Sequence, residues 1–153
     1  MAILHYTDHY ISQILQQTRT IVILGASAKP DRASHKVMRF LQEHGYRVIP
    51  VNNQTRDSII CGEKVYTHLD LVPESFQMVD IFRNIDHAIE ITEKIISLSK
   101  VKGIRTIWMQ LGIRSSDAYK IAKRAGINII MDRCPAIEIK RLSKLGLCNY
   151  SPS

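Results

Sequence analysis

The feature that most constrains this chain is a regular alternation of short apolar runs with segments of helical periodicity. Residues 20–24 form a β-branched apolar run, typical of a strand buried on both faces, and Gly25 ends it. Apolar residues at helical spacing follow over residues 33–44. The same order repeats along the chain, and it predicts a doubly wound α/β fold. We expect a mainly parallel sheet of five to six strands with helices on both faces.

The bounds of the expected elements follow from this periodicity and from glycine, proline and capping signals. Strands are expected at residues 20–24, 47–51, 64–66, 78–82, 104–109 and 127–131. Helices are expected at residues 7–17, 33–44, 87–99, 116–125 and 135–145. We interpret the domain organisation as a leading helix packed on the domain (1–19), the domain itself (20–145) and a loose C-terminal tail (146–153).

Composition narrows the class of protein. A chain of 153 residues favours one domain, and a net charge of +7 favours an anionic partner. The basic residues are scattered and not interleaved with aromatic ones, so no nucleic acid is expected. No apolar run approaches the length that spans a bilayer, so no membrane is expected. The three cysteines lack C-x-x-C spacing, which indicates a reducing cytoplasm without disulfides and predicts no metal site.

The turn after the first strand predicts an anion site. A strand, a tight turn and a helix start leave backbone N–H groups and the positive end of a helix facing one crevice, and Lys29 and Arg32 add charge there. The turn is neither a P-loop nor G-x-G-x-x-G, because Ser27 and Ala28 stand where glycines are needed. No acidic residue follows the second strand, which disfavours NAD. The expected ligand therefore carries phosphate.

Polar residues follow each of the five main expected strands, and parallel strands bring such ends to one edge of the sheet. The ordered set GAS, PVN, FR, W-x-Q-x-G and DRCP resembles the small stand-alone CoA-binding protein family. More distantly, it is similar to the CoA-binding amino-terminal domain of succinyl-CoA synthetase alpha subunits. The resemblance runs over residues 20–142 and departs from the family pattern at Asn53, where a proline is frequent.

The resemblance implies a Rossmann-like, nucleotide-binding domain that binds coenzyme A or an acyl-CoA without catalysis of its own. It places the phosphates near the first turn, the adenosine beside the end of the second strand, and an amide near the far end of the pantetheine. The residues that it implies for binding are Gly25, Ala26, Ser27, Lys29, Arg32, Val51, Asn52, Phe82, Arg83 and Gln110. It implies no phosphorylated histidine and no ligase activity, and it names no protein partner.

Alternative roles remain open for several of these residues. Ser27 is also suited to cap the following helix, Arg83 to pair with Asp80 or Asp86, and Gln110 to satisfy neighbouring backbone groups. Trp108 is expected in the core.

Two other classes of function also remain open. Cys134 precedes Pro135 at an expected helix start beside Arg133, where the pKa of a thiol falls, so a small cysteine-dependent enzyme that processes acyl-CoA or nucleotides is the first alternative. Nucleic-acid binding, supported by charge alone, is the second.

Overall fold

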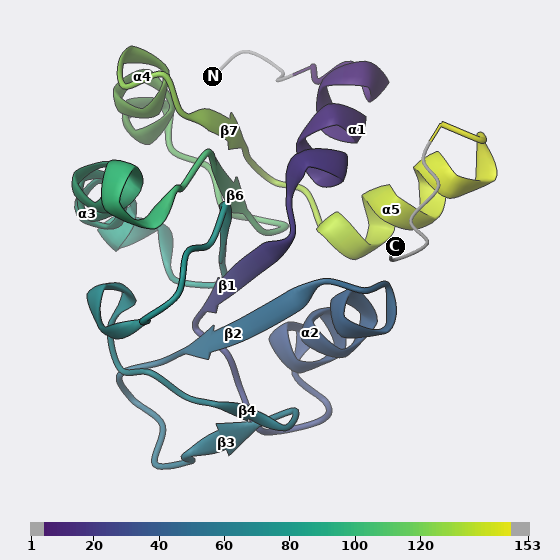
Figure 1. Ribbon diagram of the computed structural model, residues 1–153. Coiled ribbons are helices and arrows are strands. Elements are labelled where there is room, and N and C mark those ends of the chain that lie inside the picture. Colours follow the sequence, from purple (N-terminus) through teal and green to yellow (C-terminus); the bar gives the residue numbers. More distant parts are fainter. Residues whose placement is uncertain (1–4, 148–153) are drawn as a thin grey trace.

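The computed structural model describes residues 5–147 and contains one five-stranded parallel sheet (Figure 1). The strands are β1 (Thr20–Leu24), β2 (Arg47–Val51), β5 (Met78–Ile81), β6 (Thr106–Met109) and β7 (Asn128–Ile130). Their order across the sheet is β2-β1-β5-β6-β7, and every neighbouring pair is parallel. The order reverses between β1 and β5, and a doubly wound fold offers its ligand crevice at that place.

Helices cover both faces of the sheet and divide the core into two halves. One half packs against α1 (Asp8–Gln17), α2 (Ala33–Glu43) and α5 (Pro135–Lys144). The other half packs against α3 (Ala88–Lys102) and α4 (Ser116–Arg124). Side chains on β1 alternate between the two, with Ile21 and Ile23 in the first and Val22 and Leu24 in the second. The predicted doubly wound fold with helices on both faces is confirmed.

The leading helix α1 lies against the domain. Ile11 and Leu15 are buried in the first half of the core, and the hydroxyl of Tyr46 donates a hydrogen bond of 2.7 Å to the carbonyl of Leu15. Of the expected tail, residues 148–153 fall outside the described part of the chain. Within residues 5–147, no helix combines the length and apolar character needed to cross a bilayer.

Three expected boundaries differ from the structure by more than one residue. The strand predicted at residues 64–66 is instead a small antiparallel hairpin, β3 (Ile59–Ile60) with β4 (Glu63–Lys64), and Tyr66 forms only an isolated bridge with Val51. Helix α3 continues to Lys102 and ends at Gly103, which has a left-handed φ of 76°. The N–H of Ile104 donates to the carbonyl of Ser99 in the last turn of that helix, and β6 begins only at Thr106.

Candidate functional site

The loop after β1, residues 25–32, is named the β1 loop here. Gly25 opens it with a φ of +94°, a conformation that glycine adopts without strain. A Cβ added to Gly25 would lie 3.4 Å from Cβ of Phe82, the residue that follows β5. The N–H of Gly25 donates to the carbonyl of Val51 at the end of β2. The loop therefore begins where the ends of β1, β2 and β5 meet.

Side chains from two neighbouring elements hold two carbonyl groups of the β1 loop. Asn52 Nδ2 donates to the carbonyl of Ala26 at 2.7 Å, and Nδ1 of His35 lies 2.9 Å from the carbonyl oxygen of Ser27. In a trans peptide the C=O and the following N–H point in opposite directions. The N–H groups of Ser27 and Ala28 therefore point away from Asn52 and His35. Within residues 5–147 neither N–H group has a hydrogen-bond partner.

The amino end of α2 adds further N–H groups beside this loop. Arg32 is the N-cap residue and makes no side-chain capping bond, and the first turn of α2 holds no acidic residue. The first amides of a helix have no intrahelical acceptor, and they carry the positive end of the helix dipole. The β1 loop and α2 thus present donors to one place, and no side chain of the described residues caps them.

A pocket of about 590 Å³ opens at this place, and we call it the loop pocket. Residues of the β1 loop, the start of α2 and the loops after β2 and β5 line it: Gly25, Ala26, Ser27, Lys29, Arg32, Ala33, Ser34, Asn52, Gln54, Thr55 and Phe82. Lys29 and Arg32 are exposed, and neither has an ion-pair partner among the residues that the structure describes. The electrostatics of the pocket therefore favour an anion.

Most of the residues predicted for binding meet in the loop pocket. Seven of them line it: Gly25, Ala26, Ser27, Lys29, Arg32, Asn52 and Phe82. Ser27 does not cap α2, because the N-cap residue is Arg32 and the Ser27 hydroxyl accepts from the N–H of Lys29. Asn52 uses its amide group to hold the loop and also accepts from the N–H of Gln54.

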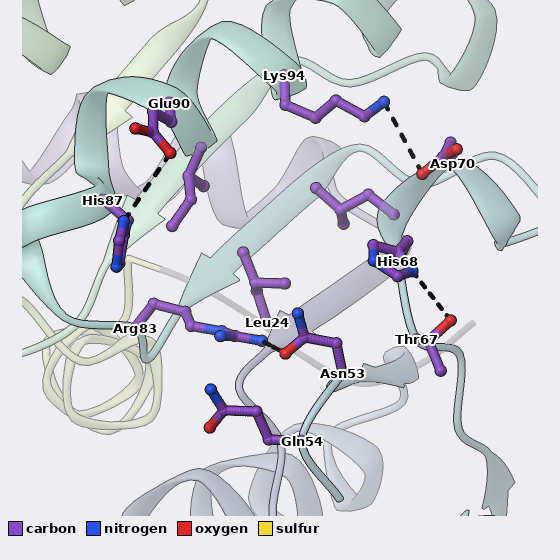
Figure 2. A pocket seen from close by; sticks show the side chains of 12 residues that line it. Leu24, Asn53, Gln54, Thr67, His68, Asp70, Arg83, His87, Glu90 and Lys94 are labelled. Atoms are coloured by element: carbon purple, nitrogen blue, oxygen red, sulfur yellow. Dashed lines mark hydrogen bonds and ion pairs between the residues drawn. The ribbon is translucent and has the colours of Figure 1, made fainter.

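A second pocket of about 420 Å³ adjoins the loop pocket, with which it shares Gln54, and we call it the α3 pocket (Figure 2). Leu24, Leu69 and Ile91 contribute apolar side chains, and polar side chains surround them. Arg83 lines this pocket and donates from Nη2 to Asn53 Oδ1 at 2.7 Å, so it joins the loops after β2 and β5. The alternative role of Arg83, pairing with Asp80 or Asp86, is not seen among the described residues.

Two predicted residues line neither of these pockets. Val51 is buried in the core, and its carbonyl supports the β1 loop. Gln110 is buried, and its Nε2 lies 3.2 Å from both carboxyl oxygens of Asp80. Asp80 has no exposed surface, and this burial raises its pKa to about 8 despite the hydrogen bond from Gln110.

Cys134 is not an activated thiol, and the expectation of a lowered pKa is wrong. Its side chain is 7% exposed, and burial raises its pKa more than the amides of Ala136 and Ile137 at the start of α5 lower it. The guanidinium of Arg133 pairs with Glu138 at 2.8 Å. A buried thiol of raised pKa is a poor nucleophile at neutral pH.

The W-x-Q-x-G and DRCP motifs contact each other. Trp108, fully buried as expected, donates from Nε1 to the carbonyl of Arg133 at 2.9 Å. The carboxylate of Asp132 accepts from the N–H of Gly112 at 2.7 Å and also pairs with Arg114. These contacts join the ends of β6 and β7. The two motifs therefore hold together the segments that follow β6 and β7 at the carboxyl edge of the sheet.

Sequence reasoning missed part of the lining of both pockets. In the α3 pocket, four of the missed residues belong to a stretch of the sequence without a motif: Thr67, His68, Leu69 and Asp70. Two more, Glu90 and Lys94, lie on the surface of a helix, where charged residues are ordinary. The one available signal was helical spacing, which places Ile91 and Lys94 on neighbouring turns of α3. Within residues 5–147, no group of three His, Cys, Asp or Glu is placed to hold a metal ion.

Comparisons with known proteins bear on this site. The model of a family described as a CoA binding domain matches residues 19–140. "Uncharacterized protein YneT" of Bacillus subtilis (strain 168) is 31% identical over 124 residues, which are 81% of this chain and 87% of that protein. A hypothetical protein from Pyrococcus horikoshii OT3 has a similar structure, with a TM-score of 0.82 and 33% identity over 94% of this chain and 99% of that one.

A more distant likeness concerns the fold alone. The dinucleotide forming acetyl-coenzyme A synthetase 1 of Ca. Korarchaeum cryptofilum superposes with a TM-score of 0.57 at 17% identity. The superposition covers 72% of this chain and 25% of the synthetase chain.

Proposed function

This chain belongs to the CoA binding domain family, and we propose that it binds coenzyme A or an acyl-CoA with the diphosphate in the loop pocket. The observation that carries the proposal is the set of unpartnered backbone donors there. Ser27 and the start of α2 line this pocket, and the N–H of Ala28 lies in the next peptide group along the loop. Lys29 and Arg32 line the same pocket, and neither has an ion-pair partner within residues 5–147. Backbone donors and a helix amino end together suit phosphate oxygens.

The adenosine is proposed to occupy the α3 pocket. An adenine ring is flat and mostly apolar, and this pocket offers Leu24, Leu69 and Ile91 together with polar groups at its margin. Because Gln54 lines both pockets, one ligand can extend from the diphosphate to the base. Arg83, at the margin of the α3 pocket, is available to a phosphate once its bond to Asn53 opens.

We propose that the protein binds its ligand without using Cys134 as a catalytic residue. A cysteine-dependent enzyme needs an accessible thiolate, whereas Cys134 is buried and its pKa is raised. The cysteine content without disulfide-type spacing supports the cytoplasm as the proposed location.

Calorimetric titration of the reduced protein with coenzyme A tests the proposal, run beside 3′-dephospho-CoA, ADP and NAD. We expect saturable binding of coenzyme A that weakens at least roughly tenfold in Arg32→Ala, since a hydrogen bond to a charged group contributes about 1.5–3 kcal/mol. The matched control is Arg105→Ala, which removes the same exposed charge just before β6, at the opposite edge of the sheet. Absence of coenzyme A binding, or equal loss in both variants, would contradict the proposed site.

A further inference from the structure

His35 occupies the first turn of α2 but points into the protein. Its side chain is 8% exposed, and it is not among the residues that line the loop pocket. Nδ1 lies 2.9 Å from the carbonyl oxygen of Ser27. Because a carbonyl oxygen only accepts, Nδ1 must carry the proton in this contact.

A cysteine thiol covers the ring of His35. Sγ of Cys61 lies 3.8 Å from Nδ1 and 3.7 Å from Nε2. Nearly equal distances to the two nitrogens place the sulfur over the face of the ring, because an in-plane position at these distances would overlap ring carbons. Cys61 sits in the turn of the β3–β4 hairpin, which Gln42 of α2 holds through the carbonyl of Cys61 at 3.1 Å. The ring is thus held on one face by Cys61 and at its edge by Ser27.

The contact between His35 and Ser27 sets the direction of one peptide group of the β1 loop. The carbonyl of Ser27 and the N–H of Ala28 belong to the same peptide plane and point in opposite directions. While His35 holds the carbonyl on the buried side, the N–H of Ala28 faces away from the protein interior. Without this donor, the peptide group is free to turn and place the carbonyl oxygen where an anion is to bind.

We propose that His35 is a positioning residue for the ligand phosphate, acting through the carbonyl of Ser27 and held in place by Cys61. This inference rests on the proposed function, because it concerns how the loop pocket is prepared for a phosphate. His35 touches no ligand in this scheme. Its contribution is to orient a backbone donor before binding, so that the cost of ordering the loop is met in the free protein.

Two variants of matched shape test the role of the donor. His35→Asn keeps an N–H group attached to Cγ, at the place of Nδ1, whereas His35→Leu has the same branching without a donor. We expect the Asn variant to bind coenzyme A within about threefold of wild type, and the Leu variant to bind at least about fivefold more weakly, as loss of one hydrogen bond predicts. Circular dichroism and thermal unfolding identify any variant that fails to fold.

A spectroscopic measurement separates positioning from general destabilisation. In ¹⁵N-labelled protein, the amide signal of Ala28 should shift on addition of coenzyme A in wild type and in His35→Asn, and lose most of that shift in His35→Leu. In the free protein, the imidazole nitrogen signals should show the proton on Nδ1. A folded Leu variant with an unchanged Ala28 response would overturn the inference, as would a proton found only on Nε2.

The outcomes also distinguish this inference from the proposed function. If wild-type protein binds no coenzyme A, the proposed function fails and the role of His35 fails with it. If wild type binds coenzyme A while the Asn and Leu variants bind with equal affinity, only the inference about His35 is overturned. If Leu weakens binding and Asn retains it, both stand.

Discussion

Asp80 is a buried carboxyl group in the central sheet, and it has no ion-pair partner within residues 5–147. It lies on β5 opposite Ile23 of β1 and Trp108 of β6, and Gln110 supplies the hydrogen bond that its oxygens receive. An isolated ionised carboxylate is costly in such surroundings, so the neutral acid is the stable form at pH 7. From the sequence, Asp80 was named only as a candidate partner of Arg83, because Gln110, which donates to its carboxyl group, lies 30 positions further along the chain.

Replacing Asp80 by Asn changes stability with pH in a defined direction. The folded protein keeps the carboxyl protonated up to its raised pKa of about 8, whereas the unfolded chain ionises near 3.8. Between these values the folded state binds more protons, so the free energy of unfolding of wild type falls as pH rises. The Asp80→Asn variant has no carboxyl group at this position, so its free energy of unfolding lacks this decrease with pH. Its stability relative to wild type should therefore grow from pH 5 to about pH 8 and then stay constant.

Urea unfolding of both proteins at pH 5, 6.5, 8 and 9 measures this difference. The upper limit of the slope is about 1.4 kcal/mol per pH unit within the window. Asp117→Asn, which removes an exposed carboxyl group from the first turn of α4, is the control for loss of one charge. A difference curve for Asp80→Asn that is flat with pH would show that the buried carboxyl group ionises normally.

At the scale of secondary structure, the boundaries show which signals are local. Periodicity and caps located all five helices, because a helix is closed by bonds within one short segment. The strand ends were predicted less accurately. Ile104 has the apolar, β-branched character of a strand residue, but its N–H donates to the carbonyl of Ser99 at the end of α3. Tyr66 looks like strand but meets Val51 alone, because the hairpin turn at Cys61 and Gly62 takes the residues before it.

The W-x-Q-x-G and DRCP motifs illustrate a second limit of sequence reasoning. Each motif follows a strand, which correctly predicts its place at the carboxyl edge of the sheet. Position alone does not tell whether polar residues face a ligand or each other. Trp108 and Gly112 bond to the segment 132–133, so these residues serve β6 and β7. By contrast, seven predicted residues around the β1 loop do line one pocket.

Helix α1 provides a test of how the leading segment contributes to stability. Thr7 is its N-cap residue, and the hydroxyl accepts from the N–H of Tyr10 at 3.1 Å. We expect Thr7→Ala to lower the free energy of unfolding by about 1 kcal/mol, the usual loss for a removed N-cap. Coenzyme A affinity should not change, since α1 supplies no residue to either pocket.

Urea unfolding compared with Ser115→Ala checks this prediction, because Ser115 caps α4 in the same way through the N–H of Ala118 at 3.1 Å. Equal losses would indicate that α1 unfolds together with the domain. A loss at Ser115 without one at Thr7 would mean that α1 separates from the domain before the sheet unfolds.

For the molecule as a whole, the net charge of +7 leaves two kinds of anion to consider, a phosphorylated small molecule and a nucleic acid. The arrangement of donors favours the first. Backbone N–H groups that converge on a pocket suit a compact diphosphate, whereas a nucleic acid needs cations spread along its backbone. The difference becomes measurable in the stability of the whole domain, because only a ligand that binds the folded state raises it.

Coenzyme A at one hundred times its dissociation constant should stabilise the folded domain by about 2.7 kcal/mol, and raise Tm by roughly 5–10 °C. ADP should give part of this shift, because it fills the two pockets without the pantetheine arm. Duplex DNA at 0.15 M salt should leave Tm unchanged, since exposed charges that do not converge are screened over about 8 Å. Differential scanning calorimetry of the reduced protein measures all three. A shift with DNA that vanishes at higher salt, together with none for coenzyme A, would assign the positive charge to a nucleic-acid surface and contradict the loop pocket as a phosphate site.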